Sequence, residues 1–155
     1  MDKEAFAARM EEMGDELYSI ARTYLRTPSD CADAVQEATL LAWKNLLSLK
    51  QEAYFKTWVV RILINECKHI LRNAKRFISL AQIPEVQAPD DADPAVFQAI
   101  FSLDIRYRVP FMLFHVDGYS TKEIAAILRL PKGTVTSRLQ RARRALRDIL
   151  GGDGV

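Results

Sequence analysis

The stretch from residue 118 to residue 144 constrains the fold most, because two helical patterns in it are separated by a strong break. Ser120 and Glu123 have the spacing of a capping box, which predicts that a first helix begins there. Residues 130–133 read Leu-Pro-Lys-Gly and end that helix, since Pro and Gly both disfavour a helix interior. Thr134 is then available to cap a second helix.

The second helix of this pair is amphipathic. Its apolar stripe consists of Val135, Leu139, Ala142 and Leu146. Its opposite side carries Thr136, Ser137, Gln140, Arg141 and Arg144. Hydroxyl, amide and guanidinium groups on one face suit base edges and phosphates in a DNA major groove, so the stretch predicts a DNA-binding helix-turn-helix. An ordinary helical hairpin with a solvated charged face is the alternative.

Size and composition exclude several classes of protein. The 155 residues suffice for one domain or two small ones. No apolar run approaches the ~20 residues of a membrane span and no secretory signal is visible, so we expect no membrane insertion and a cytoplasmic location. Cys31 and Cys67 are too few and too far apart for a metal framework, and either packing or a redox pair explains them. With two scattered histidines and no nucleophile–base pattern or Gly-rich phosphate loop, we expect no metal, no cofactor and no catalytic residues.

The net charge of +2 conceals a strong segregation of charge. Residues 50–76 and 95–155 are basic, whereas residues 1–49 and 77–94 are acidic. Two basic blocks predict two surfaces for polyanions, and the acidic surface is available to another partner.

Helical periodicity runs through the first half of the chain. We expect a short helix at residues 3–13, with an interruption at Gly14 and Asp15 unless the helix continues to about Arg26. A third helix is predicted from about Asp30 to Leu49, and a long fourth one from about Tyr54 to Arg76.

Two faces of these helices carry polar patterns. The third helix exposes Asp33, Gln36, Glu37 and Leu40, which is either a docking surface or a solvated helix face. The fourth helix carries a cationic stripe that includes Arg61, Asn65, Lys68 and Arg72, with Trp58 near its start. Aromatic rings beside cations suit unstacked bases, although for Trp58 alone a place in the core is the simpler explanation.

Residues 77–94 lose the helical period and are rich in Pro and Asp, which predicts a flexible acidic linker. The fold class is therefore all-α, with helical domains at residues 1–76 and 95–155. In the second domain, Pro110 is expected in the first turn of a helix that runs from about Val109 to Asp117.

The sequence resembles bacterial RNA polymerase sigma factors of the extracytoplasmic-function (ECF) group over nearly its whole length. In the first domain the resemblance rests on the residues at 30–37, on Ala42-Trp43 and on the segment 55–62 with Asn65 and Arg72. In the second domain it rests on the residues at 107–111, 118–120, 123–125 and 133–143.

The resemblance implies a role for each polar face. The set Asp33, Gln36, Glu37 and Leu40 matches the motif that grips the clamp helices of core RNA polymerase. The set Lys56, Trp58, Arg61, Asn65, Lys68 and Arg72 matches the segment that melts and reads the promoter −10 element, with base capture by the loop at 50–54. The set Thr134, Thr136, Ser137, Arg138, Gln140, Arg141 and Arg144 matches positions that meet the −35 element.

The resemblance also implies an anti-sigma factor as a partner, beside core polymerase and promoter DNA. Two positions depart from the family's pattern. His69 stands where many members have Asp, and Thr136 stands where many have Lys or Arg. A stand-alone helix-turn-helix regulator that binds DNA as a dimer is the alternative function.

Overall fold

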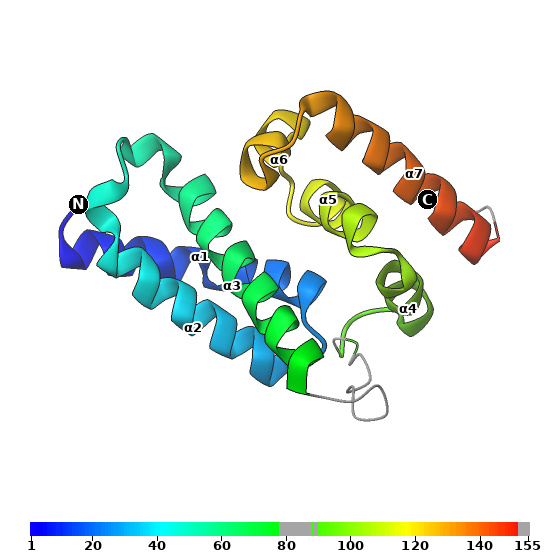
Figure 1. Cartoon of the computed structure of the whole chain (residues 1–155), viewed down its shortest axis with the longest axis horizontal. Coiled ribbons are helices and arrows are strands. Elements are labelled where there is room, and N and C mark those ends of the chain that lie inside the picture. Colours follow the sequence, from blue (N-terminus) through cyan, green and yellow to red (C-terminus); the bar gives the residue numbers. More distant parts are fainter. Residues whose placement is uncertain (78–87, 89, 152–155) are drawn as a thin grey trace. The chain divides into compact units, whose positions relative to one another are not determined.

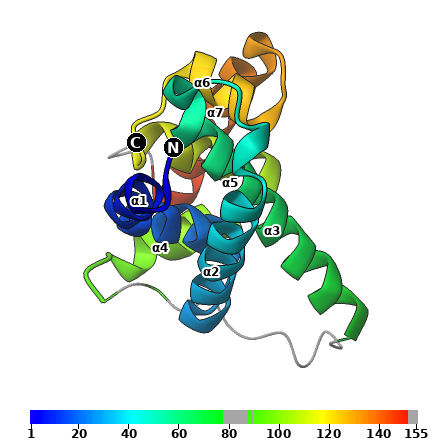
Figure 2. The ribbon, with the colours of Figure 1, turned by 90° about the vertical axis from the view of Figure 1, so that its left-hand side faces the viewer.

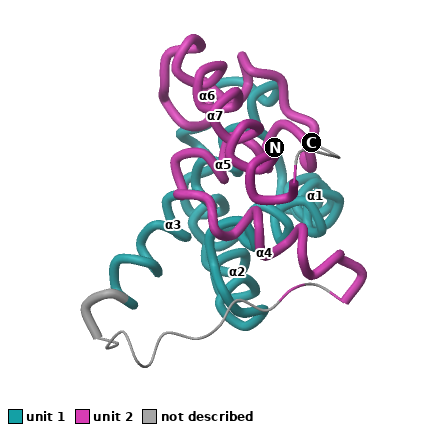
Figure 3. The backbone as a smooth tube through the Cα atoms, turned by 90° about the vertical axis from the view of Figure 1, so that its right-hand side faces the viewer, with its two compact units in different colours: residues 1–84 teal, residues 85–155 magenta. Residues whose placement is uncertain are grey.

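The structure is a computed structural model that describes residues 1–77, 88 and 90–151. Every regular element in these ranges is a helix (Figure 1). The chain divides into two compact units, residues 1–84 and 85–155, which Figure 3 colours separately. Most of the sequence-predicted linker falls on residues 78–87 and 89, which lie outside the described residues.

The first unit contains α1 (Lys3–Tyr24), α2 (Pro28–Lys44) and α3 (Phe55–Phe77). Two short 3₁₀ turns, η1 (Leu46–Ser48) and η2 (Glu52–Tyr54), connect α2 to α3. Each of the three helices packs against the other two; Figure 2 looks nearly along α1, with α2 and α3 beside it.

Small side chains let α2 lie close to its neighbours. Its buried residues are Cys31, Ala34, Ala38 and Ala42, whereas Val35 is only partly buried. Larger apolar groups from α1 and α3 fill the rest of this core, including Leu17, Ile20, Phe55, Val59 and Leu63. Burial of this apolar surface from three amphipathic helices holds the unit together.

In the first unit the structure decides one alternative that the sequence left open and contradicts one predicted boundary. The helix α1 continues through Gly14, because burial of Met13 and Leu17 outweighs the ~1 kcal/mol that glycine costs in a helix. The helix α2 ends at Lys44 and not at Leu49. The Asn45 side chain donates to the Leu41 carbonyl at 2.8 Å, and such local hydrogen bonds compete with helix continuation.

The second unit contains α4 (Pro94–Ser102), α5 (Ile105–His115), α6 (Thr121–Leu128) and α7 (Lys132–Leu150). The helix α7 packs against each of the other three. Its apolar stripe is buried as predicted, at Val135, Leu139, Ala142 and Leu146. The start of α6 is also confirmed: Ser120 accepts from the Glu123 backbone at 3.1 Å, and Glu123 accepts from the Ser120 backbone at 3.0 Å.

Two predictions for the second unit are wrong. The helix α5 begins at Ile105, before Pro110, because Asp104 caps it by accepting from the Arg106 backbone at 2.9 Å. Pro110 then lies inside the helix, where it can donate no hydrogen bond to the Arg106 carbonyl. Thr134 is not the cap of α7, because the helix already begins at Lys132.

Candidate nucleic-acid and polymerase interfaces

The polar face of α7 is open to solvent. Thr136, Ser137, Gln140, Arg141 and Arg144 are all exposed, while Thr134 and Arg138 are partly buried. The capping box of α6 and the left-handed Arg129 at its end fix the turn that leads into α7. The second helix of this pair therefore presents hydroxyl, amide and guanidinium groups side by side, as a helix that enters a major groove must do.

The hydroxyl of Thr136 is already engaged. It donates to the Lys132 carbonyl at 3.1 Å, within its own helix. What Thr136 offers to a partner is therefore its methyl group and an acceptor oxygen. A threonine methyl suits apolar contact with the methyl group of thymine.

A pocket of about 430 Å³ lies beside the predicted −35 face, between α5 and α7. The α7 residues Gly133, Thr134, Ser137, Arg138 and Arg141 and the α5 residues Arg106 and Tyr107 line it. Arg141 donates from Nη1 to the Tyr107 hydroxyl at 3.1 Å, and this hydrogen bond lowers the pKa of Tyr107. The sequence set contains neither Arg106 nor Tyr107, and no local pattern links Tyr107 to Arg141, which lies 34 residues away.

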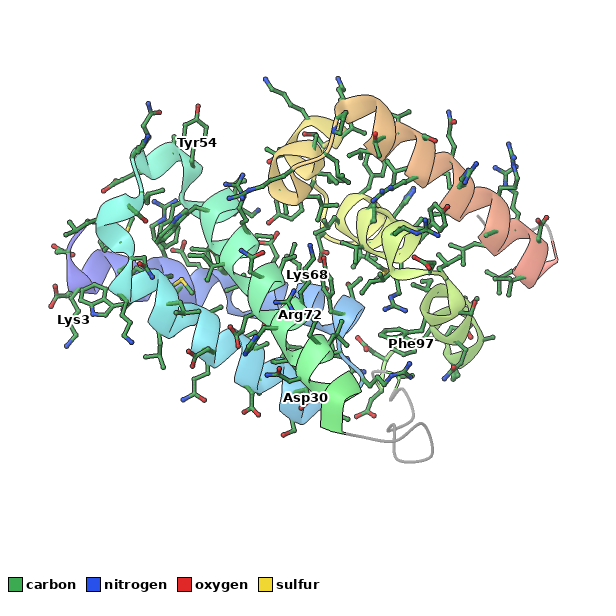
Figure 4. The ribbon with its side chains drawn as sticks, in the orientation of Figure 1. Lys3, Asp30, Tyr54, Lys68, Arg72 and Phe97 are labelled. Carbon is green, nitrogen blue, oxygen red and sulfur yellow. The ribbon has the colours of Figure 1, made fainter. Side chains whose placement is uncertain are left out.

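The cationic stripe of α3 is less uniform than its spacing predicts. Asn65, Lys68 and Arg72 are exposed, and Figure 4 places Lys68 and Arg72 on the second half of α3. Arg61, in contrast, is partly buried, and Lys56 forms an ion pair with Glu16 at 3.3 Å. Apart from Lys56, the exposed side chains of this stripe therefore lie toward the carboxyl end of α3.

The rings of Trp58 and Tyr54 differ in how far they are exposed to solvent. The Trp58 ring is partly buried, 6.1 Å from the ring of Phe55, which is fully buried and lies 5.9 Å from Phe6. Tyr54, in contrast, is 61% exposed at the end of the connection before α3 (Figure 4). Of the two rings, Tyr54 is the one that a base could stack on without disturbing the core.

The connection that carries Tyr54 is tied to α1. The Arg9 guanidinium lies 4.4 Å from the Phe55 ring centroid and donates to the Glu52 carbonyl at 3.5 Å. The amino terminus of Met1 lies 3.5 Å from the Glu52 carboxylate. These contacts tie the connection before α3 to the amino-terminal end of the first unit.

The predicted docking face of α2 is fully available. Asp33, Gln36, Glu37 and Leu40 are all exposed, with Leu40 at 52%. Trp43, at 43%, continues this face toward the end of α2, and its ring packs 5.2 Å from that of Phe6. A large apolar side chain left exposed among carboxylates and an amide is typical of a protein-binding surface.

Among residues 1–77, 88 and 90–151, no group of three or more His, Cys, Asp or Glu side chains is placed to hold a metal ion. In the same part of the chain, no helix has both the length and the apolar character of a membrane span.

Comparisons with known proteins match both units. Residues 10–77 match the family "Sigma-70 region 2", and residues 95–146 match "Sigma-70, region 4". The ECF RNA polymerase sigma factor SigM of Mycobacterium tuberculosis is 31% identical over 97% of this chain and 79% of its own length. The ECF RNA polymerase sigma-E factor of Escherichia coli K12 is 32% identical over 94% of this chain and 86% of its own length.

Solved structures agree with these matches. The sigma factor RpoE of Bartonella quintana, crystallised with the anti-sigma factor NepR, has a TM-score of 0.86 and 25% identity over 97% of this chain and 99% of that one. CnrH, in complex with the cytosolic domain of CnrY, has a TM-score of 0.77 and 28% identity over 99% of this chain and 92% of that one. The order of both regions and the extent of these alignments show that the chain belongs to the extracytoplasmic-function (ECF) group of the sigma-70 family of RNA polymerase sigma factors.

Proposed function

We propose that this protein binds core RNA polymerase and directs it to promoters by recognising a −35 element with its second unit and a −10 element with its first. The main support for this proposal is the exposed polar face of α7. This helix follows the capped helix α6 across a tight turn, in a chain of the sigma-70 family. The alternative of a stand-alone dimeric regulator has no support among the relatives.

The −35 element is read as a closed duplex. The polar side chains of α7 face the major groove, with Gln140 and Arg141 in the middle of the helix as candidates for base contacts. The residues assigned to this surface are Thr134, Thr136, Ser137, Arg138, Gln140, Arg141 and Arg144. Phosphate contacts from the arginines add an affinity that falls with salt concentration.

The −10 element is bound as separated strands. The residues assigned here are Lys56, Trp58, Arg61, Asn65, Lys68 and Arg72. We add Tyr54 to this set, because its ring is exposed. Opening duplex DNA costs a mean of ~1.4 kcal/mol per step. Each base stacked on an aromatic ring returns ~1–3 kcal/mol, so a few such contacts offset a short bubble.

The polymerase is bound through α2. The assigned face, Asp33, Gln36, Glu37 and Leu40, combines carboxylates with an exposed leucine. The polymerase supplies the chemistry, so the chain itself is not an enzyme and acts in the cytoplasm beside the polymerase. Because RpoE and CnrH are each solved with a partner, NepR or CnrY, we also propose an inhibitory protein partner for this chain.

Transcription in vitro tests this function directly. Core polymerase is incubated with fragmented genomic DNA with and without the purified chain, and the 5′ ends of the RNA products are sequenced. We expect a set of start sites that depends on the chain and shares a −35 and a −10 sequence. Identical products with and without the chain would refute the proposal.

A further inference from the structure

We propose that Tyr107 of α5 is a positioning residue for −35 recognition, in that its hydroxyl orients the Arg141 guanidinium toward the base pair that Arg141 reads. The inference rests on the proposed function of α7 and adds a residue outside the recognition helix. It also predicts that the preference for one base pair of the −35 element depends on Tyr107, although Tyr107 itself contacts no base.

The two residues meet at the pocket between α5 and α7. Arg141 is exposed, and its Nη1 donates to the Tyr107 hydroxyl at 3.1 Å. The Tyr107 ring is partly buried and packs against the core of the second unit, which restricts the positions that its hydroxyl can take. The pocket beside the pair has a volume of about 430 Å³, and its lining includes Ser137 and Arg138 of α7.

A second set of contacts fixes the tyrosine itself. The Arg106 guanidinium lies 5.3 Å from the Tyr107 ring centroid. Arg106 in turn donates from Nε to the Asp104 carboxylate at 3.0 Å, and Asp104 caps α5. The hydrogen bond to Arg141 is therefore the last of a series of contacts that begins at Asp104, the N-cap residue of α5.

Fixing an arginine in this way favours base recognition. A guanidinium has five N–H donors in one plane, so one donor can bond to Tyr107 while others remain for a bidentate contact with a base. An exposed arginine loses rotamer entropy when it binds, and a preformed hydrogen bond reduces that loss. The orientation also fixes the plane of the fork, which decides whether the geometry of guanine is matched.

Competition binding with the holoenzyme tests the inference. The full-length chain, assembled with core polymerase, is measured on the −35 duplex identified by the transcription experiment, with each of the four base pairs substituted in turn at every −35 position. Tyr107→Phe keeps the ring in the core and removes only the hydroxyl. We expect the base preference to fall about 2- to 10-fold at one position, as for loss of one hydrogen bond, with the salt dependence unchanged.

A double-mutant cycle identifies Arg141 as the residue that Tyr107 acts through. Arg141→Ala should reduce preference at the same position, and Tyr107→Phe should have no further effect in that background. Arg144→Ala is the matched control, because Arg144 is an exposed arginine on the same helix outside the pocket. Tyr107→Phe should have its full effect in the Arg144→Ala background.

Three results would overturn the inference. An equal loss on all duplexes would show that the hydroxyl supports a phosphate contact and not a base contact: with an unchanged salt slope the contact is that of the neutral Tyr107 hydroxyl, and with a smaller slope it is that of the Arg141 cation. Additive effects of Tyr107→Phe and Arg141→Ala would show that the two residues act separately. A wild-type holoenzyme that binds the −35 duplex no better than a scrambled one would overturn the proposed function of α7, and the inference with it.

Discussion

The guanidinium of Arg108 lies 4.2 Å from the ring centroid of Phe101 and donates from Nη1 to the carbonyl oxygen of the same residue at 2.9 Å. It also donates to the Leu103 carbonyl at 3.4 Å. Arg108 is on α5 and is only 9% exposed, whereas both acceptors belong to the end of α4 and the residue after it. One buried cation therefore satisfies carbonyl groups that the end of α4 leaves without helical donors.

Replacing Arg108 should destabilise the second unit. Arg108→Met keeps much of the apolar stem but leaves the Phe101 carbonyl without its donor, so we expect the free energy of unfolding to fall by about 2–4 kcal/mol. Denaturant titration followed by far-ultraviolet circular dichroism measures the loss. Both tryptophans, Trp43 and Trp58, belong to the first unit, so the tryptophan fluorescence transition should not move. An Arg108→Met variant as stable as the wild type would show that the Arg108 contacts do not stabilise the second unit.

A charge reversal on α2 should abolish polymerase binding. Glu37 is exposed on the proposed docking face, so Glu37→Lys should leave the helix intact while it reverses the charge that a basic partner requires. Adding Gln36→Lys should strengthen the effect. Pull-down of core polymerase with the tagged chain measures binding, and circular dichroism measures helical content.

Glu11→Lys provides the matched control, because Glu11 is an exposed carboxylate on α1 and the change in net charge is the same. It should bind polymerase as the wild type does. If Glu37→Lys also bound normally, the polymerase would have to contact another face of the first unit.

The two cysteines should be nearly inert in the folded protein. Cys31 and Cys67 are both free and fully buried, and burial raises the pKa of Cys31 to about 11 and that of Cys67 to about 12. Since the thiolate is the reactive form, alkylation by iodoacetamide at about pH 8 should be at least about a hundredfold slower than in the unfolded chain. Mass spectrometry of labelled peptides measures both rates. Rapid labelling of the native protein would instead favour a redox role for the pair.

Helical periodicity was sufficient to predict the architecture. The stripe at Val135, Leu139, Ala142 and Leu146 is buried, because any side chains spaced at 3.6 residues share one face of a helix. The capping box at Ser120 was equally predictable, since both of its hydrogen bonds form within four residues. Such features are local, so a single sequence is enough to find them.

The wrong predictions concern competition between local preferences and tertiary contacts. Pro110 was expected to begin a helix, but the Asp104 cap and the burial of Val109 and Phe111 keep it inside one. At Gly14 the sequence left both a break and a continuous helix open, and the helix continues because the apolar residues around Gly14 are buried on the same face. Propensity is worth about 1 kcal/mol for glycine, which burial of one or two large side chains exceeds.

The partnership of Tyr107 with Arg141 could not be predicted in the same way. No spacing rule connects residues 34 positions apart on different helices. The sequence identified Arg141 as a candidate from its place on α7, but only the packing of α5 against α7 brings a tyrosine hydroxyl to it. A residue that positions a base-contacting side chain is therefore harder to find from sequence than the base-contacting side chain itself.

Acidification should weaken the second unit through His115. Its Nε2 accepts a hydrogen bond from Arg143 Nε at 3.2 Å, and its ring packs 4.5 Å from that of Phe111 and 4.9 Å from that of Phe114. Although His115 is exposed overall, desolvation of its ring, with a smaller effect from the Arg143 charge, lowers its pKa. A protonated ring could not accept the Arg143 hydrogen bond and would add a like charge beside it.

The sign of the pH effect follows from this lowered pKa. The unfolded chain binds the His115 proton at a higher pH than the folded chain does, so the stability due to neutral His115 is present above the ordinary histidine pKa of ~6.5 and is lost as the pH falls through the lower folded value. Denaturant titrations by circular dichroism between about pH 8 and pH 5 measure the change. His115→Gln keeps a polar side chain but does not titrate, so it should lose less stability across this range, and the only other histidine, His69, belongs to the first unit. Parallel curves for wild type and His115→Gln would mean that other groups cause the pH dependence, and that the Arg143 contact survives protonation.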